Sequence, residues 1–354
     1  MVYERNYYPD ELIYPGMTLS DLLNSIWMSQ KELSVRMDMS EKQISGIIQW
    51  KFSITPETAL KLERVLWVDA EFWSNLERAY QEDKVRMKEE KLLEIEQEEV
   101  TKFTCYSKLV ELWFVKKVRK KTEKLKELLS FFGVTSIFSI SKVSNIVYRK
   151  TESKNLDINQ ENLLAWLRCG ELKARDIEVD EFSRLKFRQI IPELKKLTKK
   201  DYIDLDKIKQ LLSSAGVIFV YIPYFTKVPV NGVSKKINGK PLIQISDRWK
   251  KLDIFWFSLF HEIAHVLNHL SKKDDLFLNF EFKSDGKDIE EEANIWAGET
   301  LINTEIYTKI QRGRSIVQIA REAWVWVHIV AGRVGYDTWA WSDMAEYRKR
   351  ICFL

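Results

Sequence analysis

Two histidines that bracket a glutamate are the residues of this chain best suited to do chemistry. His261 and His265 stand four positions apart in the run His-Glu-Ile-Ala-His, and Glu262 follows the first of them. On a helix, residues four apart share one face, about 5–6 Å apart at Cβ, so both imidazoles can bind one metal ion. Glu262 is turned about a quarter-circle from His261. This places its carboxylate beside a metal-bound water, where a general base is needed.

A catalytic metal site also needs a third protein ligand and an open position for water. Residues 288–297 have helical spacing of aromatic and small residues, and they include Glu290, Glu291 and Glu292. We expect one of these three glutamates to face the metal from a second helix. His269 lies about 12 Å of helix rise beyond His261, so we interpret it as a structural or supporting residue. Imidazole and carboxylate ligands with one open position favour Zn²⁺.

The composition predicts a protein of two or three domains with real hydrophobic cores. The chain has 354 residues, of which 45% are hydrophobic and 12% aromatic. Its N-terminus has neither a basic start nor an apolar stretch, so we expect no signal peptide, and no apolar run is long enough for a membrane span. Three widely spaced cysteines indicate a reducing compartment without a cysteine zinc cluster. We therefore predict a cytoplasmic protein without a membrane partner.

Residues 1–82 contain the start signals of a helix-turn-helix domain. Ser29 is a good N-cap with Glu32 three residues later, and Ser40 begins another helix after a short break. Thr55 followed by Pro56 is a further helix start. The helix from Ser40 would be the recognition helix. The candidate DNA-binding residues on these elements are Ser29, Gln30, Ser40, Lys42, Gln43, Ser45 and Lys51.

Charge is distributed unevenly along the first third of the chain. Residues 1–82 have eight Lys and Arg against thirteen Asp and Glu, a net charge of −5. Phosphate binding depends on Lys and Arg, so a protein-interaction or dimerisation module competes with DNA binding. Residues 83–100 read as a solvated connecting helix. Residues 101–126 have nine Lys and Arg against two Glu, which indicates either a solvated helix face or an additional nucleic-acid contact.

The remaining pattern is helical to about residue 200 and then includes short strands. Residues 217–221 and 241–246 are predicted strands, and Asn231-Gly232 is a predicted turn. The fold class is therefore mainly α with a small β-sheet (α+β). We expect three regions: a helix-turn-helix domain at 1–82, a helical connecting region at 83–200 and a peptidase-like domain with C-terminal helices at 201–354.

The N-terminal region resembles the HigA-type antitoxin branch of the XRE helix-turn-helix family. The resemblance departs from the family pattern at Asp38, where a turn glycine is usual, and at Gln49-Trp50, where Asn-Gly is usual. It rests on the segments Pro15-Gly16-Met17, Trp27-Met28-Ser29-Gln30-Lys31-Glu32-Leu33, Ile44-Ser45-Gly46-Ile47-Ile48, Ile54-Thr55-Pro56-Glu57-Thr58 and Ala70-Glu71-Phe72-Trp73.

The rest of the chain resembles the ImmA/IrrE family of metallopeptidases, in the branch with a HigA-like N-terminal domain. The segments that carry this resemblance are Lys240-Pro241-Leu242-Ile243-Gln244, Phe260-His261-Glu262-Ile263-Ala264-His265, Glu292-Ala293-Asn294 and Ile329-Val330-Ala331-Gly332-Arg333. The resemblance implies a gluzincin-like fold with His261 and His265 as zinc ligands, Glu262 as general base and Glu292 as third ligand. Glu290 is the alternative third ligand. The better-understood members of the family cleave helix-turn-helix repressors.

Two functions compete on this evidence. The first is a zinc endopeptidase that regulates transcription by cleaving a repressor-type protein. The second is an antitoxin-like DNA-binding regulator whose metal domain senses rather than cuts. The expected partners are a protein substrate and, through the N-terminal domain, DNA; a homodimer is considered as well. An inactive peptidase-fold scaffold is disfavoured, because metal retention alone would not require Glu262.

Overall fold

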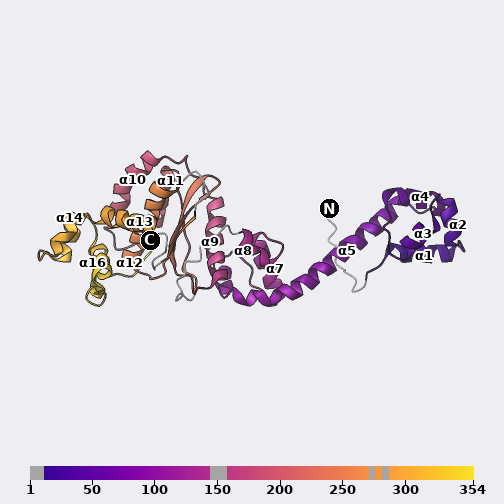
Figure 1. Cartoon of the computed structure of the whole chain (residues 1–354), viewed down its shortest axis with the longest axis horizontal. Helices are drawn as coiled ribbons and strands as arrows, with labels where there is room; N and C mark the ends of the chain where they lie inside the picture. The colour runs from indigo at the N-terminus through magenta and orange to yellow at the C-terminus, as the bar shows by residue number, and fades with distance from the viewer. Residues whose placement is uncertain (1–11, 144–157, 271–275, 281–286) are drawn as a thin grey trace. The chain divides into compact units, whose positions relative to one another are not determined.

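The computed structural model describes residues 12–143, 158–270, 276–280 and 287–354. The chain divides into two compact units, Met1–Glu98 and Glu99–Leu354, which we call unit 1 and unit 2 (Figure 1). The three-part division at residues 82 and 200 stays a prediction.

Unit 1 is a cluster of short helices around the start of a long one. Its core is made by apolar side chains at helical spacing, and four of them, Leu19, Leu33, Ile44 and Leu62, are fully buried together with Trp73. Figure 1 labels the helices, which are α1 (Pro15–Ser25), α2 (Gln30–Arg36), α3 (Glu41–Ile48), α4 (Pro56–Leu66) and α5 (Ala70–Glu96).

The predicted starts of three of these helices are confirmed. The Ser29 hydroxyl accepts a hydrogen bond from the Glu32 amide at 3.1 Å. Ser40 and Gln43 form a reciprocal capping box at the start of α3. The Thr55 hydroxyl caps α4, whose first residue is Pro56. Each such cap is worth about 1 kcal/mol, so these local signals define where the helices of unit 1 begin.

The ends of several helices have an unusual residue. Six tryptophans at or directly after a helix C-cap have φ between 57° and 65°. This left-handed conformation costs an L-residue with a side chain roughly 1–2 kcal/mol, and glycine usually occupies it. The six are Trp27, Trp50, Trp67, Trp113, Trp324 and Trp339.

Unit 2 begins with helices that lead to a sheet. Asn162, fully buried at the start of α9, accepts a hydrogen bond from the Cys105 amide and donates to Thr104 and to the Thr226 carbonyl. It therefore connects three segments of this region. The helices are η1 (Gln97–Lys102), which begins at the end of unit 1, α6 (Tyr106–Glu111), α7 (Lys121–Phe132), η2 (Ile137–Ser139), α8 (Ile140–Val143), α9 (Gln160–Arg175), α10 (Arg184–Leu197) and α11 (Leu205–Ser214).

The sheet of unit 2 is small and mixed, which confirms the α+β class. Its strand order is β1-β3-β2-β4; β1 pairs in parallel with β3, and β2 pairs antiparallel with both β3 and β4. The two predicted strands are present as β1 and β3. The prediction of a turn at Asn231-Gly232 was wrong, because both residues lie inside β2. The strands are β1 (Ile218–Tyr221), β2 (Val230–Ile237), β3 (Lys240–Ile245) and β4 (Leu276–Phe280).

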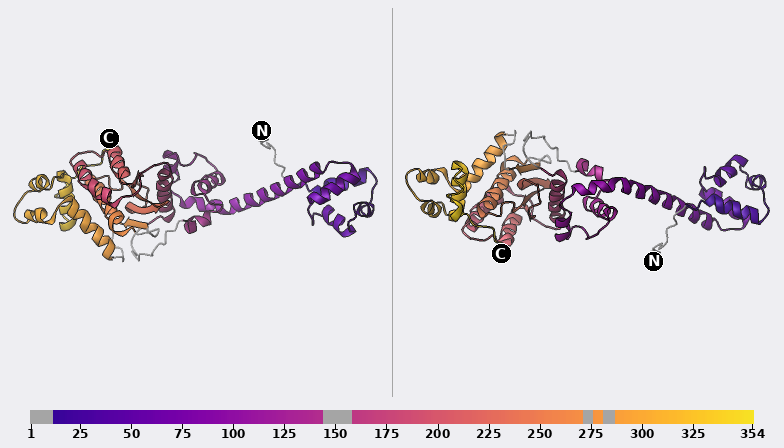
Figure 2. Two further views of the ribbon diagram at one scale, coloured as in Figure 1. Left: turned by 90° about the horizontal axis from the view of Figure 1, so that it is seen from above. Right: turned by 90° about the horizontal axis from the view of Figure 1, so that it is seen from below.

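One helix, α12 (Leu252–Ala264), is buried on nearly all sides. It contacts β2, β3, α13 and α16, and the sheet lies beside it in Figures 1 and 2. Its apolar run at 255–260 matches this burial, with Phe255, Trp256 and Phe260 no more than 1% exposed. The elements that follow it are η3 (His265–His269), α13 (Lys287–Leu301), α14 (Thr304–Tyr307), η4 (Thr308–Ile310), α15 (Ile316–Ala323), α16 (Val327–Thr338) and η5 (Ala345–Tyr347).

The last residues of the chain return to the start of α12. The guanidinium of Arg348 donates to the carboxylate of Asp253 at 2.8 Å, and both side chains are largely buried. Phe353 forms a bridge with Ile203, before α11. Among the described residues, we find no helix that combines the length and the apolar character required to cross a bilayer.

A buried histidine makes the stability of unit 2 depend on pH. Burial, with a smaller contribution from Lys349, lowers the pKa of His328 to about 4. Between pH 6.5 and about pH 4, this histidine is therefore protonated in the unfolded chain but neutral in the folded chain. The free energy of unfolding falls as the pH drops through this range. We expect this group to cost about 2 kcal/mol between pH 7 and pH 5.

The measurement is urea unfolding of the wild-type protein and of His328→Phe at both pH values. The loss of stability on acidification should be smaller in the variant. An equal loss in the two proteins would show that His328 is protonated in the folded state as easily as in the unfolded one.

Candidate metal centre

The side chains of His261, His265 and Glu290 converge on one point in unit 2. The two histidine Nε2 atoms lie 2.9 Å apart, and the Glu290 carboxylate oxygens lie 3.1 Å and 3.4 Å from them. Ligand atoms that surround a zinc ion at 2.0–2.1 Å in a tetrahedral arrangement are separated by roughly 3.3 Å. The three side chains therefore have the spacing of a metal-ligand set, with all ligand atoms within 4.8 Å of one another.

Two packed helices position these groups. His261 lies in the last turn of α12 and His265 directly after it, one turn apart on one face, and both are nearly inaccessible at 1% and 0% exposure. Glu290 projects from the first turn of α13, which packs against α12. The structure thus brings together the two histidines that the sequence singled out, with a glutamate from a second helix.

The glutamate at this centre is Glu290 and not Glu292. Two positions along a helix correspond to a rotation of about 200°, so the two carboxylates point to different sides of α13. The Glu292 carboxylate lies 3.1 Å from Nε2 of His269 instead, and its side chain is 59% exposed. The expectation that Glu292 completes the ligand set is therefore replaced by its alternative, Glu290.

A further layer of contacts orients the two imidazoles. Nδ1 of His261 lies 2.9 Å from the side-chain oxygen of Asn294, and Nδ1 of His265 lies 3.0 Å from Nδ1 of His269. Such contacts fix the ring orientation and leave Nε2 for the metal. We did not assign this role to Asn294 from the sequence, although it stands one helical turn after Glu290 and therefore on the same face of α13.

The carboxylate of Glu262 faces the sheet. It is fully buried, and the hydroxyl of Ser234 on β2 donates to one of its oxygens. Among the described residues, its other oxygen has no hydrogen-bond partner. A Cβ atom at Gly232 would lie 2.8 Å from Glu262, so only glycine leaves room for this side chain. This close approach explains why a glycine stands at this position of β2.

The protonation states of the centre follow from burial and pairing. Burial would raise the pKa of Glu290, but the hydrogen bonds to His261 and His265 outweigh it and lower that pKa to about 2. Burial lowers the pKa of His265, which favours the neutral, metal-binding form. Burial raises the pKa of Glu262 well above its ordinary value. Neutral imidazole and an ionised carboxylate are the forms that bind a metal, so the donor set fits one.

Comparison with known proteins identifies the segment that carries this centre. Residues 218–334 match the model of peptidase family M78, described as the IrrE N-terminal-like domain. This segment is therefore similar to the IrrE N-terminal-like domain, and we call it the IrrE-like domain. It contains all of the residues of the centre and β2, whose Ser234 donates to Glu262, so the IrrE-like domain of this chain has a metallopeptidase-type architecture.

Solved structures are similar to the N-terminal region. One is an addiction module antidote protein of the HigA family from Coxiella burnetii, 31% identical, with 24% of this chain and 95% of that chain covered and a TM-score of 0.23. Another is the Pseudomonas aeruginosa antitoxin HigA with the higBA promoter, 25% identical, with the same shares covered and a TM-score of 0.23. No curated protein matches the chain.

The candidate DNA-binding residues lie on α2, on α3 and just after it. Ser29 and Ser40 are helix caps, and Gln43 completes the capping box, so these three have structural roles. Gln30 and Lys42 are exposed, and the Ser45 hydroxyl accepts a hydrogen bond from Gln49, to which Lys51 donates. DNA binding by these seven residues stays a proposal.

The ligand set of the IrrE-like domain can be tested by single substitutions in α13. Glu290→Gln should remove most of the bound metal, because an amide is a far poorer ligand than a carboxylate. Glu292→Gln should weaken binding about 10-fold or more through His269. Glu291→Gln, exposed on the same helix, is the matched control and should bind as the wild type does. Elemental analysis after dialysis measures all three. Greater metal loss in Glu292→Gln than in Glu290→Gln would return the third ligand to Glu292.

Proposed function

We propose that this chain is a zinc-dependent endopeptidase that regulates transcription by cleaving a helix-turn-helix repressor-type protein. The observation that carries the proposal is the convergence of His261, His265 and Glu290, with the glutamate Glu262 next to the first of them. A buried set of two imidazoles and a carboxylate with metal spacing has no structural need for an additional buried carboxylate beside it. A peptidase has that need.

Each residue of the centre would have a separate role in peptide hydrolysis. When bound, zinc would acidify a water molecule and polarise the scissile carbonyl. Glu262 accepts the proton of the attacking water while the hydroxyl oxygen bonds to the carbonyl carbon. The same carboxyl then donates this proton to the departing amine nitrogen as the peptide bond breaks. Ser234 holds the Glu262 carboxylate in position through its hydrogen bond.

Burial of Glu262 suits this role. A carboxylate away from water is a stronger base than one at the surface, because its charged form is poorly solvated. The repressor-type substrate is what the resemblance to the ImmA/IrrE family implies. A helix-turn-helix-like unit in the same chain supports it, because such a unit can bring the IrrE-like domain to DNA-bound proteins.

The test of catalysis is Glu262→Gln. The amide cannot accept a proton from water, so we expect the variant to retain its metal and lose at least about 10²-fold in cleavage rate. Repressor-type proteins encoded next to the gene serve as substrates, and product peptides are quantified by mass spectrometry. Glu291→Gln is the control for the charge change. A Glu262→Gln variant that cleaves at the wild-type rate would remove Glu262 from the mechanism.

The second candidate function is an antitoxin-like regulator that binds DNA and whose metal domain senses rather than cuts. It is supported by the exposed polar side of α3 and by a basic segment at 101–126 with several exposed cations. We expect both to contribute to any DNA affinity, because phosphate contacts supply most of it. The exposed cations are Lys116, Lys117, Arg119, Lys120 and Lys121.

Titration of labelled promoter DNA with the full chain at two salt concentrations tests this alternative. Replacement of these five cations by glutamine should weaken binding. It should also make the plot of log affinity against log salt concentration less steep, by up to about four in slope. The control is a variant in which three lysines of α10 are changed to glutamine: Lys186, Lys195 and Lys196. Unchanged affinity in the first variant would make the basic segment a solvated face only.

A further inference from the structure

Six tryptophans occupy a backbone conformation in which glycine is expected. Among the described residues, ten that are not glycine have positive φ, and six of these are tryptophan, although the chain has only thirteen tryptophans. Asn and Asp tolerate this region because their short side chains can bond locally; a bulky aromatic residue has no such compensation. A random choice of residues would not concentrate tryptophan in this way.

The hydrogen bonds at these positions are those of a glycine-capped helix end. At Gly133 and Gly216, the amide of the next residue donates to the carbonyl five residues before it, as Val134 does to Leu129 and Val217 to Leu212, each at 3.0 Å. This is the Schellman motif, in which glycine is the usual central residue. The same bond closes the turns at Trp27, Trp50, Trp113 and Trp324, with Met28, Lys51, Phe114 and Val325 as donors.

The side chains of these tryptophans are poorly packed. Trp27, Trp67 and Trp113 are 94%, 92% and 93% exposed, and the other three are 52% to 80% exposed. Within the described parts of the chain, two of the six have a ring contact: Trp50 stacks on Tyr14, and the ammonium of Lys199 lies over Trp324. By contrast, Trp73, Trp166 and Trp256 are fully buried. Nine of the thirteen tryptophans thus fall into two groups, three in cores and six at exposed helix ends.

We infer that glycine is the native residue at positions 27, 50, 67, 113, 324 and 339, and that the gene encodes it there with UGA. Bacterial genetic codes differ in assigning this codon to stop, tryptophan or glycine. A single codon assignment accounts for all six positions at once, whereas separate substitutions would have to place the same unsuitable residue at six helix ends. The chain has 12 glycines in 354 residues, about half of the roughly 7% that is usual.

The codons of the gene test the inference directly. We expect UGA at the six positions and UGG at Trp73, Trp166 and Trp256, whose side chains the cores require. Peptide mass spectrometry of the protein from its source organism should then show glycine in the peptides that contain positions 27 and 67. UGG codons at the six positions, or tryptophan in these peptides, would overturn the inference.

A second test addresses the backbone argument by itself. The full-length protein with glycine at all six positions should melt at a temperature higher by roughly 4 °C or more than the protein with tryptophan there, because the left-handed strain is removed at each helix end. Trp73→Gly, which empties a core position, is the control and should lower the melting temperature. A six-glycine protein that melts at the same or a lower temperature would contradict the argument.

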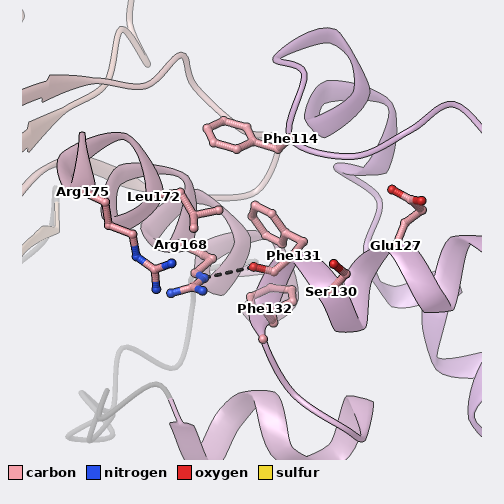
Figure 3. A pocket seen from close by; sticks show the side chains of 9 residues that line it. Phe114, Glu127, Ser130, Phe131, Phe132, Arg168, Leu172 and Arg175 are labelled. Atoms are coloured by element: carbon pink, nitrogen blue, oxygen red, sulfur yellow. Dashed lines mark hydrogen bonds between the residues drawn. The ribbon is translucent and has the colours of Figure 1, made fainter. Parts of the chain in front are cut away.

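An independent observation concerns a cavity in the helical part of unit 2. It lies between α7, α9 and the segment before α7. Its volume of about 560 Å³ is within the usual range for small-molecule sites. Figure 3 shows the aromatic side chains of Phe114, Phe131 and Phe132 around it and the guanidinium groups of Arg168 and Arg175 side by side at one end.

The two arginines are unequally paired. Arg168 donates to the Phe131 carbonyl at 3.1 Å and to the Glu171 carboxylate at 3.0 Å. Glu171 is shared, because Lys235 also donates to it at 2.7 Å. Arg175 stands seven residues after Arg168, about two turns further along α9. It has no ion pair within the described part of the chain. Glu127 also lines the cavity, where its carboxylate accepts a hydrogen bond from the Lys116 amide at 2.9 Å, and Figure 3 shows it at the opposite end from the arginines. At the arginine end, two adjacent guanidinium groups with one shared carboxylate favour the approach of an anion.

We propose that this cavity binds a small aromatic molecule with a carboxylate or phosphate group. The anionic group would lie between the arginines, and the ring would lie among the phenylalanines. Neither the arginines nor the phenylalanines take part in the metal centre.

Phenyl phosphate, benzoate and inorganic phosphate are suitable probes for the full-length protein. Phenyl phosphate or benzoate should raise the melting temperature in a saturable way, and Arg175→Gln should weaken this effect at least about 10-fold, the loss expected for a charge-assisted pair. Arg184→Gln, an exposed arginine on α10, should leave it unchanged. Failure of both aromatic probes, an unaltered effect in Arg175→Gln, or an equal effect of inorganic phosphate alone would each overturn the proposal. These results do not depend on whether the chain cleaves a protein.

Discussion

The pairing of two buried imidazoles with the carboxylate of Glu290 is the interaction on which the IrrE-like domain depends. Removing a carboxylate from water costs several kcal/mol unless it is paired in good geometry. The sequence meets this requirement by placing His261 and His265 one turn apart and packing α13 at the register that presents Glu290 to both. One turn further on, Asn294 holds the first imidazole. The register of α13 against α12 is therefore determined by polar contacts within an otherwise apolar interface.

The same constraint explains the position of β2. Glu262 follows His261 and must point elsewhere, and it points into the sheet. Gly232 leaves space for it and Ser234 donates a hydrogen bond to it. The next residue, Lys235, is paired with Glu171 on α9, which Arg168 also holds. A single strand thus connects the proposed catalytic base to α9, one of the helices that line the cavity.

The sequence predicted those features that depend on local chemistry. The caps at Ser29, Ser40 and Thr55 were readable because each satisfies backbone donors within three residues. The histidine pair was readable because a helix fixes its spacing. The turn assigned to Asn231-Gly232 was wrong because the residue that requires glycine there, Glu262, is distant in the chain. The choice among the three glutamates of α13 also depended on helix packing, which no local pattern specifies.

The helix ends with left-handed tryptophans contradict the local consistency seen at the helix starts. A chain that places Ser, Thr and Pro correctly at the beginnings of its helices is expected to place glycine at their ends as well. With glycine at position 50, the segment after α3 becomes Gln49-Gly, a turn without a bulky ring. The outward residues of that region are then Lys42, Gln43 and Lys51, all exposed and polar. Exposed aromatic rings would suggest stacking on bases or on a partner; glycine at these sites instead leaves a polar surface that can approach a phosphate backbone closely.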